Sequence, residues 1–450
     1  MAARFAVGID LGTTHTVVAW APLDAGASET RVFDVSQIIA HGQMGARPLF
    51  PSALYAPLEQ ERGCGFDDPF GDAPWVLGEH ARRRGAEVPG RVVASSKSWL
   101  VHPSVDRTAA ILPWDGREEV PKVSPVDAAA RLLSHVRRAW DVEHEDAPLP
   151  GQEIVLTVPA SFDEVGRELT IEAARRAGIA PILLEEPQAA FYDWMTRVGR
   201  DGVGRLLAAS GGEALVLVVD AGGGTTDLSL VRVSDVDRMT RVAVGPHLLL
   251  GGDNMDLALA HACEPALVEP GAKLDAARFV LLVAACRVAK ESLLGPSAPV
   301  DAPVTILGGG AHLVGNVRTT RLTREAAEHI VLDGFLPLVA GDARPQRARG
   351  GITALGLPYE RDPAITKHVA AFLARHLPAE TLPDAVLLAG GVFRAPRMAG
   401  RLVATISGWR PGSQPIERLL DSDPELAVAR GAVAYALARR GQGVRIRGGT

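Results

Sequence analysis

Two stretches of the chain share an arrangement in which an apolar, β-prone run ends on an aspartate. The first unit pairs Phe5–Asp10 with Thr16–Ala21 across a Gly-Thr-Thr turn, and this pattern predicts a hairpin. Much later in the chain, Leu215–Asp220 and Leu228–Val233 flank a turn that is richer in glycine. We interpret the recurrence as an internal repeat.

Strand and helix patterns alternate through most of the remaining sequence. A short apolar run followed by an amphipathic stretch occurs repeatedly, which is typical of strand-turn-helix units. Asp253 is predicted to cap the helix that opens at 251–253. The predicted strands are 154–158, 182–184, 304–307 and 385–388, and the other predicted helices are 124–141, 163–177, 188–197, 275–294, 323–339, 362–375, 395–406 and 425–439.

Two segments interrupt this pattern. Residues 33–124 are rich in proline and glycine and are predicted to be an irregular insertion, whereas 199–212 is predicted to be a glycine-rich linker that ends the first lobe. Across the chain there are 47 glycines and 32 prolines without a Gly-X-Y period, so many tight turns are expected and a collagen fold is excluded.

Composition narrows the class of protein. With 47% hydrophobic and 22% charged residues in 450, the chain is expected to form two to four globular domains. A net charge of −6 argues for neither a nucleic-acid nor a membrane partner. Three cysteines without C-x-x-C spacing, no targeting signal and no membrane-length apolar run predict a soluble, cytoplasmic protein.

The two strand-ending aspartates carry the first chemical prediction. Burying Asp10 or Asp220 without a partner costs several kcal/mol, and a pair of carboxylates suits Mg²⁺, which takes its remaining ligands from water and phosphate. The adjacent turns, 12–14 and 222–225, offer backbone N–H groups to phosphate oxygens without obstructing side chains. The alternative is two unrelated surface hairpins, which the matching position of the aspartate disfavours.

Three motifs, FAVGIDLGTTHTVVAW, LVVDAGGGTTDLSLV and VLLAGGVFRAPRMAGRL, resemble the phosphate-1, phosphate-2 and adenosine motifs of actin-like ATPases. Further motifs, TVPASFDEVGRELTIEAARRAGI, LLEEPQAAFYDW and LGGDNMD, resemble the nucleotide-binding domain of the 70-kDa heat-shock (DnaK-type) chaperones. The resemblance implies an α/β fold in which two ribonuclease-H-like lobes enclose a cleft for ATP or ADP and Mg²⁺. It also implies ATP hydrolysis and a protein partner or client.

The resemblance assigns roles to individual residues. Asp10 and Asp220 would hold the metal through water, and Glu186 and Thr225 would position the attacking water. Pro159 and Arg167 match an interlobe switch, although Pro159 alone also reads as a strand stop and Glu186 as a loop acid. The residues implied to bind the nucleotide are Gly12, Thr13, Thr14, Gly222, Gly223, Gly224, Thr225, Gly251, Gly252, Asp253, Lys290, Gly390, Gly391 and Arg394.

Several positions depart from the family pattern. Arg82 stands where these chaperones carry a catalytic lysine; either it takes that role and hydrolysis is slow, or it is a solvated helix residue. Lys290 matches a family lysine, with a partly exposed helix charge as the alternative. Around it, Arg287 replaces a usual acid and Glu291 a usual base.

The predicted organisation follows from these motifs. Lobe I is expected at 1–205 with its insertion at 33–124 and the helix at 425–440, and lobe II at 206–424 with an insertion at about 247–340. Residues 441–450 read as a tail, and no peptide-binding domain is expected. The predicted function is a heat-shock-type ATPase whose lobe closure regulates a partner. A sugar-type kinase and an actin-like filament-forming ATPase are the alternatives.

Overall fold

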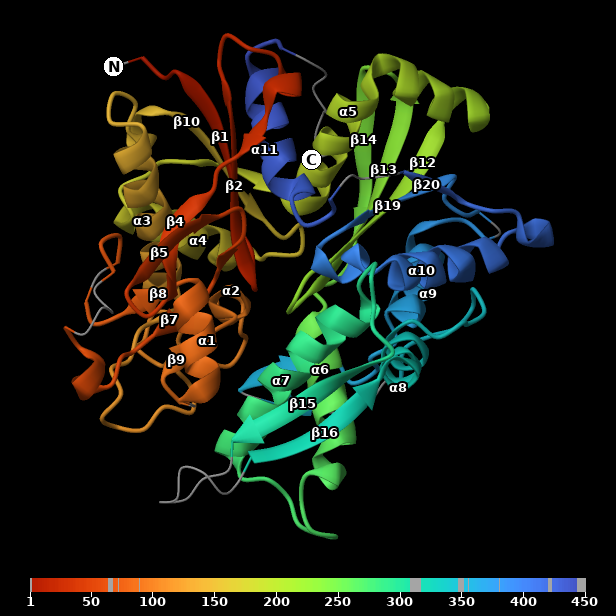
Figure 1. The fold of residues 1–450 in the computed structure, drawn as a ribbon. Coiled ribbons are helices and arrows are strands. Elements are labelled where there is room, and N and C mark those ends of the chain that lie inside the picture. Colours follow the sequence, from red (N-terminus) through yellow and green to blue (C-terminus); the bar gives the residue numbers. More distant parts are fainter. Residues whose placement is uncertain are drawn as a thin grey trace.

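The computed structural model describes residues 2–63, 68–71, 73–88, 90–307, 317–346, 352–354, 356–379, 381–419 and 423–442. Most of the predicted tail, from 443 onward, lies outside these residues. Figure 1 shows two halves, with the N-terminal residues in red and orange on one side and residues 214–420 in green and blue on the other.

The sheet of lobe I has the strand order β11-β10-β1-β2-β3, with a short extra strand beside β2. β1 is antiparallel to β2 and parallel to β10, so the hairpin predicted at the N-terminus lies in the middle of a mixed sheet. The strands are β1 (Phe5–Leu11), β2 (His15–Pro22), β3 (Arg31–Val32), β6 (Phe50–Pro51), β10 (Glu153–Val158) and β11 (Ile182–Glu185).

The sheet of lobe II repeats this arrangement. Its order is β14-β13-β12-β19-β20, and β12 is antiparallel to β13 and parallel to β19. The shared topology confirms the internal repeat and the predicted fold class of two ribonuclease-H-like lobes. The strands are β12 (Ala214–Ala221), β13 (Thr226–Asp235), β14 (Arg238–Val244), β19 (Ala385–Ala389) and β20 (Glu417–Leu419).

Two helices join the lobes, and each follows one sheet in the sequence but packs against the other. α5 (Glu186–Ala209) follows β11 and contacts β12 and β13, whereas α11 (Ala427–Arg439) follows β20 and covers β1, β2 and β10. Figure 1 shows the two helices side by side between the sheets. Their approach is so close that a Cβ on Gly431 would lie 1.7 Å from the carbonyl oxygen of Ala189.

The insertions form smaller subdomains beside the cleft. The described part of the segment predicted to be irregular contains two small sheets, β4-β5 and β8-β7-β9, and two α-helices. Helices α3 and α4 follow it and cover lobe I. The elements are β4 (Val35–Ala40), β5 (Gln43–Arg47), β7 (Leu54–Tyr55), β8 (Val76–Leu77), α1 (Glu79–Glu87), β9 (Val92–Val93), α2 (Ser96–Trp99), α3 (Pro125–Glu143) and α4 (Glu164–Arg176).

The corresponding part of lobe II is built on two helices and a hairpin. α6 and α7 pack against each other, and β15 pairs with β16. The elements of this part are α6 (Gly252–Cys263), α7 (Ala276–Leu294), β15 (Asp301–Leu307), β16 (Val317–Thr323) and α8 (Arg324–Glu328). They are followed in the chain by β17 (Ile352–Ala354), β18 (Leu357–Tyr359), α9 (Ile365–His376) and α10 (Pro396–Gly408).

Two local predictions differ from the structure. The segment 199–212 is not a linker, because α5 continues to Ala209 through a kink at Gly199 (φ 64°, ψ −176°), so the boundary predicted at 205 falls inside this helix. Asp253 does not cap α6: the side chain of Asn254 accepts the Gly251 N–H at 2.8 Å, and the helix begins at Gly252. Within the described residues, every helix is too short or too polar to cross a lipid bilayer.

Candidate functional site

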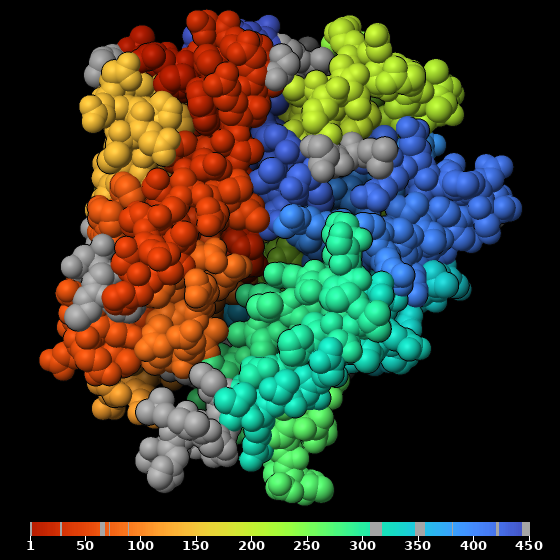
Figure 2. Space-filling model, viewed as in Figure 1, coloured from red at the N-terminus to blue at the C-terminus, as the bar shows by residue number. Residues whose placement is uncertain are grey.

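A cavity of about 460 Å³ lies between the lobes and takes its walls from both. Figure 2 shows the hollow between the orange surface of lobe I and the green and blue surface of lobe II. Most of the predicted site residues line it, with Gly224 and Gly251 as exceptions. Those that line it are Asp10, Gly12, Thr13, Thr14, Arg82, Glu186, Asp220, Gly222, Gly223, Thr225, Gly252, Asp253, Lys290, Gly390, Gly391 and Arg394.

The glycine turn of lobe II is held in place by backbone hydrogen bonds. Gly222 N–H donates to the Thr225 carbonyl at 2.9 Å, and the first N–H groups of α6, at Gly252 and Asp253, donate to the carbonyls of Gly222 and Gly223 at 3.0 and 2.7 Å. The Cβ of an alanine at 223 would lie 1.8 Å from Thr14 Oγ1 of lobe I. The two predicted phosphate turns therefore meet across the cleft, and glycine is required for that approach.

Gly224 and Gly251 have structural positions behind the cavity wall. A Cβ on Gly224 would lie 2.7 Å from Thr13 Cγ2 and 3.0 Å from Ser98 Oγ, both in lobe I. One on Gly251 would lie 2.5 Å from the Gly223 carbonyl oxygen. These two glycines permit close packing of the turns and do not face the cavity.

The two strand-ending carboxylates face the same cavity. Asp10 accepts a hydrogen bond from Thr157 Oγ1 at 3.1 Å, and burial raises its pKa although the charge of Lys97 opposes this. Burial, together with the negative charges of Asp10 and Asp227, raises the pKa of Asp220 to about 7. Such a concentration of buried carboxylates favours a bound cation.

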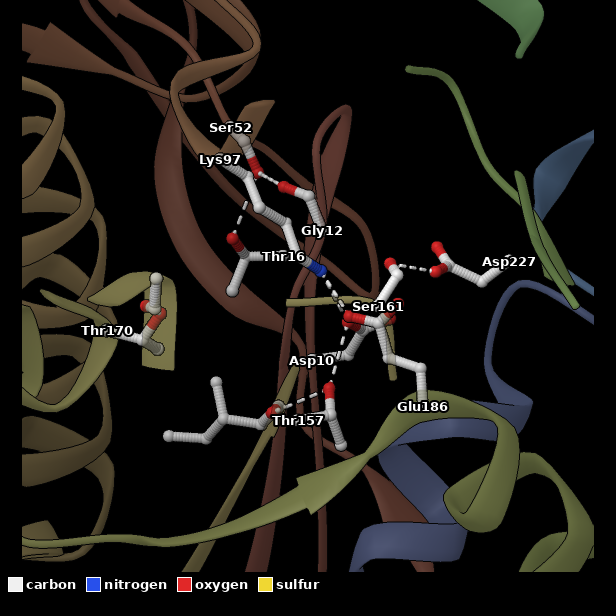
Figure 3. A network of polar contacts seen from close by, with 12 residues as sticks. Asp10, Gly12, Thr16, Ser52, Lys97, Thr157, Ser161, Thr170, Glu186 and Asp227 are labelled. Atoms are coloured by element: carbon white, nitrogen blue, oxygen red, sulfur yellow. Dashed lines mark hydrogen bonds and ion pairs between the residues drawn. The ribbon is translucent and has the colours of Figure 1, made fainter. Parts of the chain in front are cut away.

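Lys97, which sequence reasoning did not select, lies at the centre of these carboxylates. Its Nζ forms a short ion pair with Glu186 and lies 4.0 Å from Asp10 Oδ1, as Figure 3 shows. The Lys97 side chain is only 9% exposed. Although burial lowers the pKa of Lys97, the charges of Glu186 and Asp10 raise it above its ordinary value.

The loop before α2 directs Lys97 into the cleft. Ser95 adopts a left-handed conformation (φ 54°), which is uncommon for a residue with a side chain. Its hydroxyl donates to Asp253 Oδ2 of lobe II at 3.2 Å. The only sequence signal for Lys97 is its rarity, since the chain has five lysines, and it falls in the segment interpreted as an irregular insertion.

Arg82 does not occupy the position expected for it. It lies on α1 at the cavity margin, where its Nη1 is 3.2 Å from His15 Nε2, and its guanidinium is about one-third exposed. His15 in turn donates from Nδ1 to Glu425 Oε1 at 2.9 Å, because a carboxylate only accepts. Both Arg82 and Lys97 line the cavity, but Lys97 is the cation that lies beside Glu186 and Asp10.

The predicted adenosine side carries its own ion-pair network. Arg287 Nη2 is 2.6 Å from Asp253 Oδ1, and its Nε is 2.7 Å from Asp256 Oδ2. Lys290 Nζ is 2.7 Å from Asp256 Oδ1 and donates to the Gly252 carbonyl at 3.0 Å. Lys290 of α7 is therefore a paired, mostly buried cation that contacts the start of α6.

Opposite this network, the Gly-Gly pair after β19 comes close to the end of β12. Gly390 has φ 87°, and a Cβ there would lie 2.3 Å from the Ala221 carbonyl oxygen. Arg394 Nη1 donates to Glu425 Oε2 at 2.9 Å. That ion pair occupies part of the Arg394 guanidinium that the resemblance assigned to the nucleotide.

Two further groups of contacts join the lobes at residues that do not line the cavity. Ser161, in the loop after β10, donates a short hydrogen bond to Asp227 of β13, which Figure 3 also shows, and lies 2.7 Å from His247 Nδ1. Glu185 accepts from Arg167 Nη2 at 2.8 Å and pairs closely with Arg241 of β14. Arg167, one of the two predicted switch residues, thus belongs to a cross-lobe ion cluster.

The donor set fits a hard divalent cation. Among the described residues, no group of three or more histidine, cysteine, aspartate or glutamate side chains is arranged to hold a metal ion by itself. Asp10 and Asp220 supply two carboxylates, so a cation here would complete its shell from water and phosphate, as Mg²⁺ does.

Comparison with known proteins agrees with this architecture. The family model described as "Hsp70 protein" matches residues 93–333, more than half of the chain. The chain belongs to the Hsp70 family. The matched region of this Hsp70-family protein includes Lys97, Glu186 and Asp220, whereas Arg82 precedes it.

Curated relatives are similar over most of the chain. A "Chaperone protein HscA homolog" from Methylibium petroleiphilum is 30% identical over 421 residues, which are 88% of this chain and 59% of that protein. Another from Bordetella pertussis is 31% identical over 420 residues, with coverage of 88% and 58%. This Hsp70-family chain therefore spans about three fifths of the length of the relatives it matches.

Proposed function

We propose that this Hsp70-family chain binds ATP with Mg²⁺ in the cleft and hydrolyses it to ADP and phosphate. The observation that carries the proposal is the ion pair of Lys97 with Glu186 beside Asp10, in one cavity that both glycine turns also reach. Phosphoryl transfer depends mainly on positioning and on neutralising charge, and this arrangement supplies both.

Each wall of the cavity has a part in the proposal. Asp10 and Asp220 would hold Mg²⁺ through water, and the metal would neutralise charge on the phosphates when bound. Thr13, Thr14 and the 222–225 turn would donate hydrogen bonds to phosphate oxygens, each worth roughly 1.5–3 kcal/mol. Glu186 would orient the attacking water.

Lys97 takes the role that the resemblance assigned to a family lysine. Its ammonium would stabilise the charge that develops on the transferred phosphoryl group, and water exclusion would strengthen that interaction. Lys290 and the 390–391 glycines would face the nucleoside. With Lys97 in that role, the slow hydrolysis expected from an arginine at Arg82 is not part of this proposal.

We further propose that nucleotide-dependent closure of the lobes regulates a protein partner. The relatives described as chaperones support this inference, and the Ser161–Asp227 and Glu185–Arg241 contacts would break if the lobes separated. Small-angle X-ray scattering in ATP and in ADP measures closure directly. Identical scattering curves in the two nucleotides would contradict regulation by closure.

Thr225→Ala is the variant that tests the proposed hydrolysis. We expect it to lower ATP turnover about 10- to 100-fold because it removes a positioned hydroxyl from the phosphate turn. Thr381→Ala is the control, since Thr381 is exposed and does not line the cavity. Phosphate release measures turnover, and calorimetry measures Mg-ATP binding.

The same assay separates the alternatives. Wild-type protein that neither binds Mg-ATP nor releases phosphate would contradict the proposal. ADP production that requires an added sugar would indicate a kinase, and sedimentation of the protein in ATP would indicate a filament.

A further inference from the structure

A two-stranded unit leaves lobe II and packs into lobe I. β17 and β18 form an antiparallel pair on either side of Gly356. The chain reaches this unit after α8 and returns to α9, whose Ile365 and Phe372 are buried in the core of lobe II. Leu357 and Tyr359 of β18 are instead buried in the core of lobe I. We call β17, Gly356 and β18 the cross-lobe arm.

The tip of the cross-lobe arm contacts two tryptophans of the lobe I insertion. A Cβ on Gly356 would lie 2.7 Å from Trp99 Cη2 and 2.8 Å from Trp114 Cδ1. The ring centroids of Trp99 and Trp114 are 5.0 Å apart. Gly356 has φ 82°, so the position requires glycine both for its backbone conformation and for the ring contact.

A histidine fixes the same tip through its backbone. His102 Nε2 is 3.1 Å from the Gly356 carbonyl oxygen, and because a carbonyl only accepts, Nε2 carries the proton. The other ring nitrogen, Nδ1, accepts the Ser104 N–H at 3.2 Å. The neutral ring thus satisfies both contacts while stacking on Trp99 with centroids 5.1 Å apart.

The base of the cross-lobe arm is attached near the nucleotide turn of lobe II. The N–H of Glu360 donates to the Leu249 carbonyl at 3.2 Å, just before the start of α6. The first N–H groups of α6 hold the 222–225 turn, as described above. The arm therefore connects the lobe I insertion to the segment that supports the phosphate turn.

Lobes joined by a hinge move as bodies, and such motion opens and closes a ligand cleft. A rotation that widens this cleft must separate Trp99, Trp114 and His102 from Gly356, or detach the arm from Leu249. We propose that the cross-lobe arm is a strap that holds the lobes closed and thereby sets the rate at which bound nucleotide leaves. This inference rests on the proposed nucleotide binding.

Gly356→Ala tests the strap against a matched glycine. The added methyl would displace the tryptophans, so we expect roughly tenfold faster release of a fluorescent N-methylanthraniloyl ADP in stopped flow. Gly271→Ala is the control, because Gly271 also has φ 82° but has no other heavy atom within 4 Å of a Cβ. The control carries the same backbone strain without the ring contact.

A second variant tests the strap even if Gly356→Ala does not fold. Trp114→Ala removes one of the two rings that contact Gly356, at a side chain that is 49% exposed and therefore tolerant of substitution. We expect this variant also to release the ADP probe faster than wild type, by a smaller factor than Gly356→Ala. Equal release rates in wild type, Gly356→Ala and Trp114→Ala would overturn the strap while leaving nucleotide binding intact. A wild-type protein that does not bind the ADP probe would overturn the proposed function itself.

Discussion

Replacement of Lys97 by methionine is expected to lower the turnover of ATP by about 100-fold or more, the usual effect of removing one positioned group that stabilises transition-state charge. Lys97 is the buried cation that touches Glu186 and approaches Asp10, so its loss removes positive charge from the place where phosphoryl transfer would occur. Methionine preserves the length of the side chain. Single-turnover hydrolysis measures the chemical step apart from product release.

Two controls separate the role of Lys97 from that of Arg82 and from general surface charge. Arg82→Met should change turnover by only a few-fold, and Lys273→Met, on an exposed residue, should not change it. A large loss in Arg82→Met with normal hydrolysis in Lys97→Met would restore the arginine to the role predicted from sequence.

Loss of Lys97 also leaves Glu186 without its ion-pair partner. Burial already raises the pKa of Glu186 well above its usual value, so the unpaired side chain is expected to take up a proton. The double variant Lys97→Met/Glu186→Gln removes the unpaired carboxyl. It should recover the thermal stability that Lys97→Met loses, which would show that the loss comes from the unpaired carboxyl. Turnover is not compared in this double variant, because Glu186 is itself proposed to orient the attacking water.

Gly431→Ala is expected to lower the free energy of unfolding by about 3 kcal/mol or more, at the upper end of the cost of overpacking. The methyl would lie 1.7 Å from the Ala189 carbonyl oxygen, so α11 and α5 would have to separate. The two helices and both sheets contribute to one apolar core, which includes Val216 of β12 and Val433 of α11. Urea denaturation followed by circular dichroism measures the effect.

Gly400→Ala is the matched control for this substitution. Gly400 lies within α10, and a Cβ there would have no other heavy atom within 4 Å. Alanine is a better helix former than glycine by about 1 kcal/mol, so this variant should be slightly more stable than wild type. Equal loss of stability in both variants would show that helix packing at Gly431 is not the cause.

Local pattern was sufficient for the repeated unit and for the residues closest to it. A strand that ends in an aspartate before a glycine turn predicts a hairpin from neighbouring residues alone, so Asp10, Asp220 and their turns were recognised without the fold. The ends of the predicted elements agreed less well with the structure. Gly199 reads as a linker residue by its type, but the helix continues past it because α5 packs against the sheet of lobe II.

Local pattern along the chain indicated the two carboxylate hairpins, and the resemblance of its short motifs to a known family implied the fold class and most of the cavity lining. The cation beside Asp10 and Glu186, by contrast, is identified by the folded chain. Lys97 is far from Glu186 along the chain, and a left-handed Ser95 and a four-residue helix bring it there. The cross-lobe arm could not be predicted from the sequence either, because its contacts with Trp99 and Trp114 form only when both lobes have folded and lie against each other.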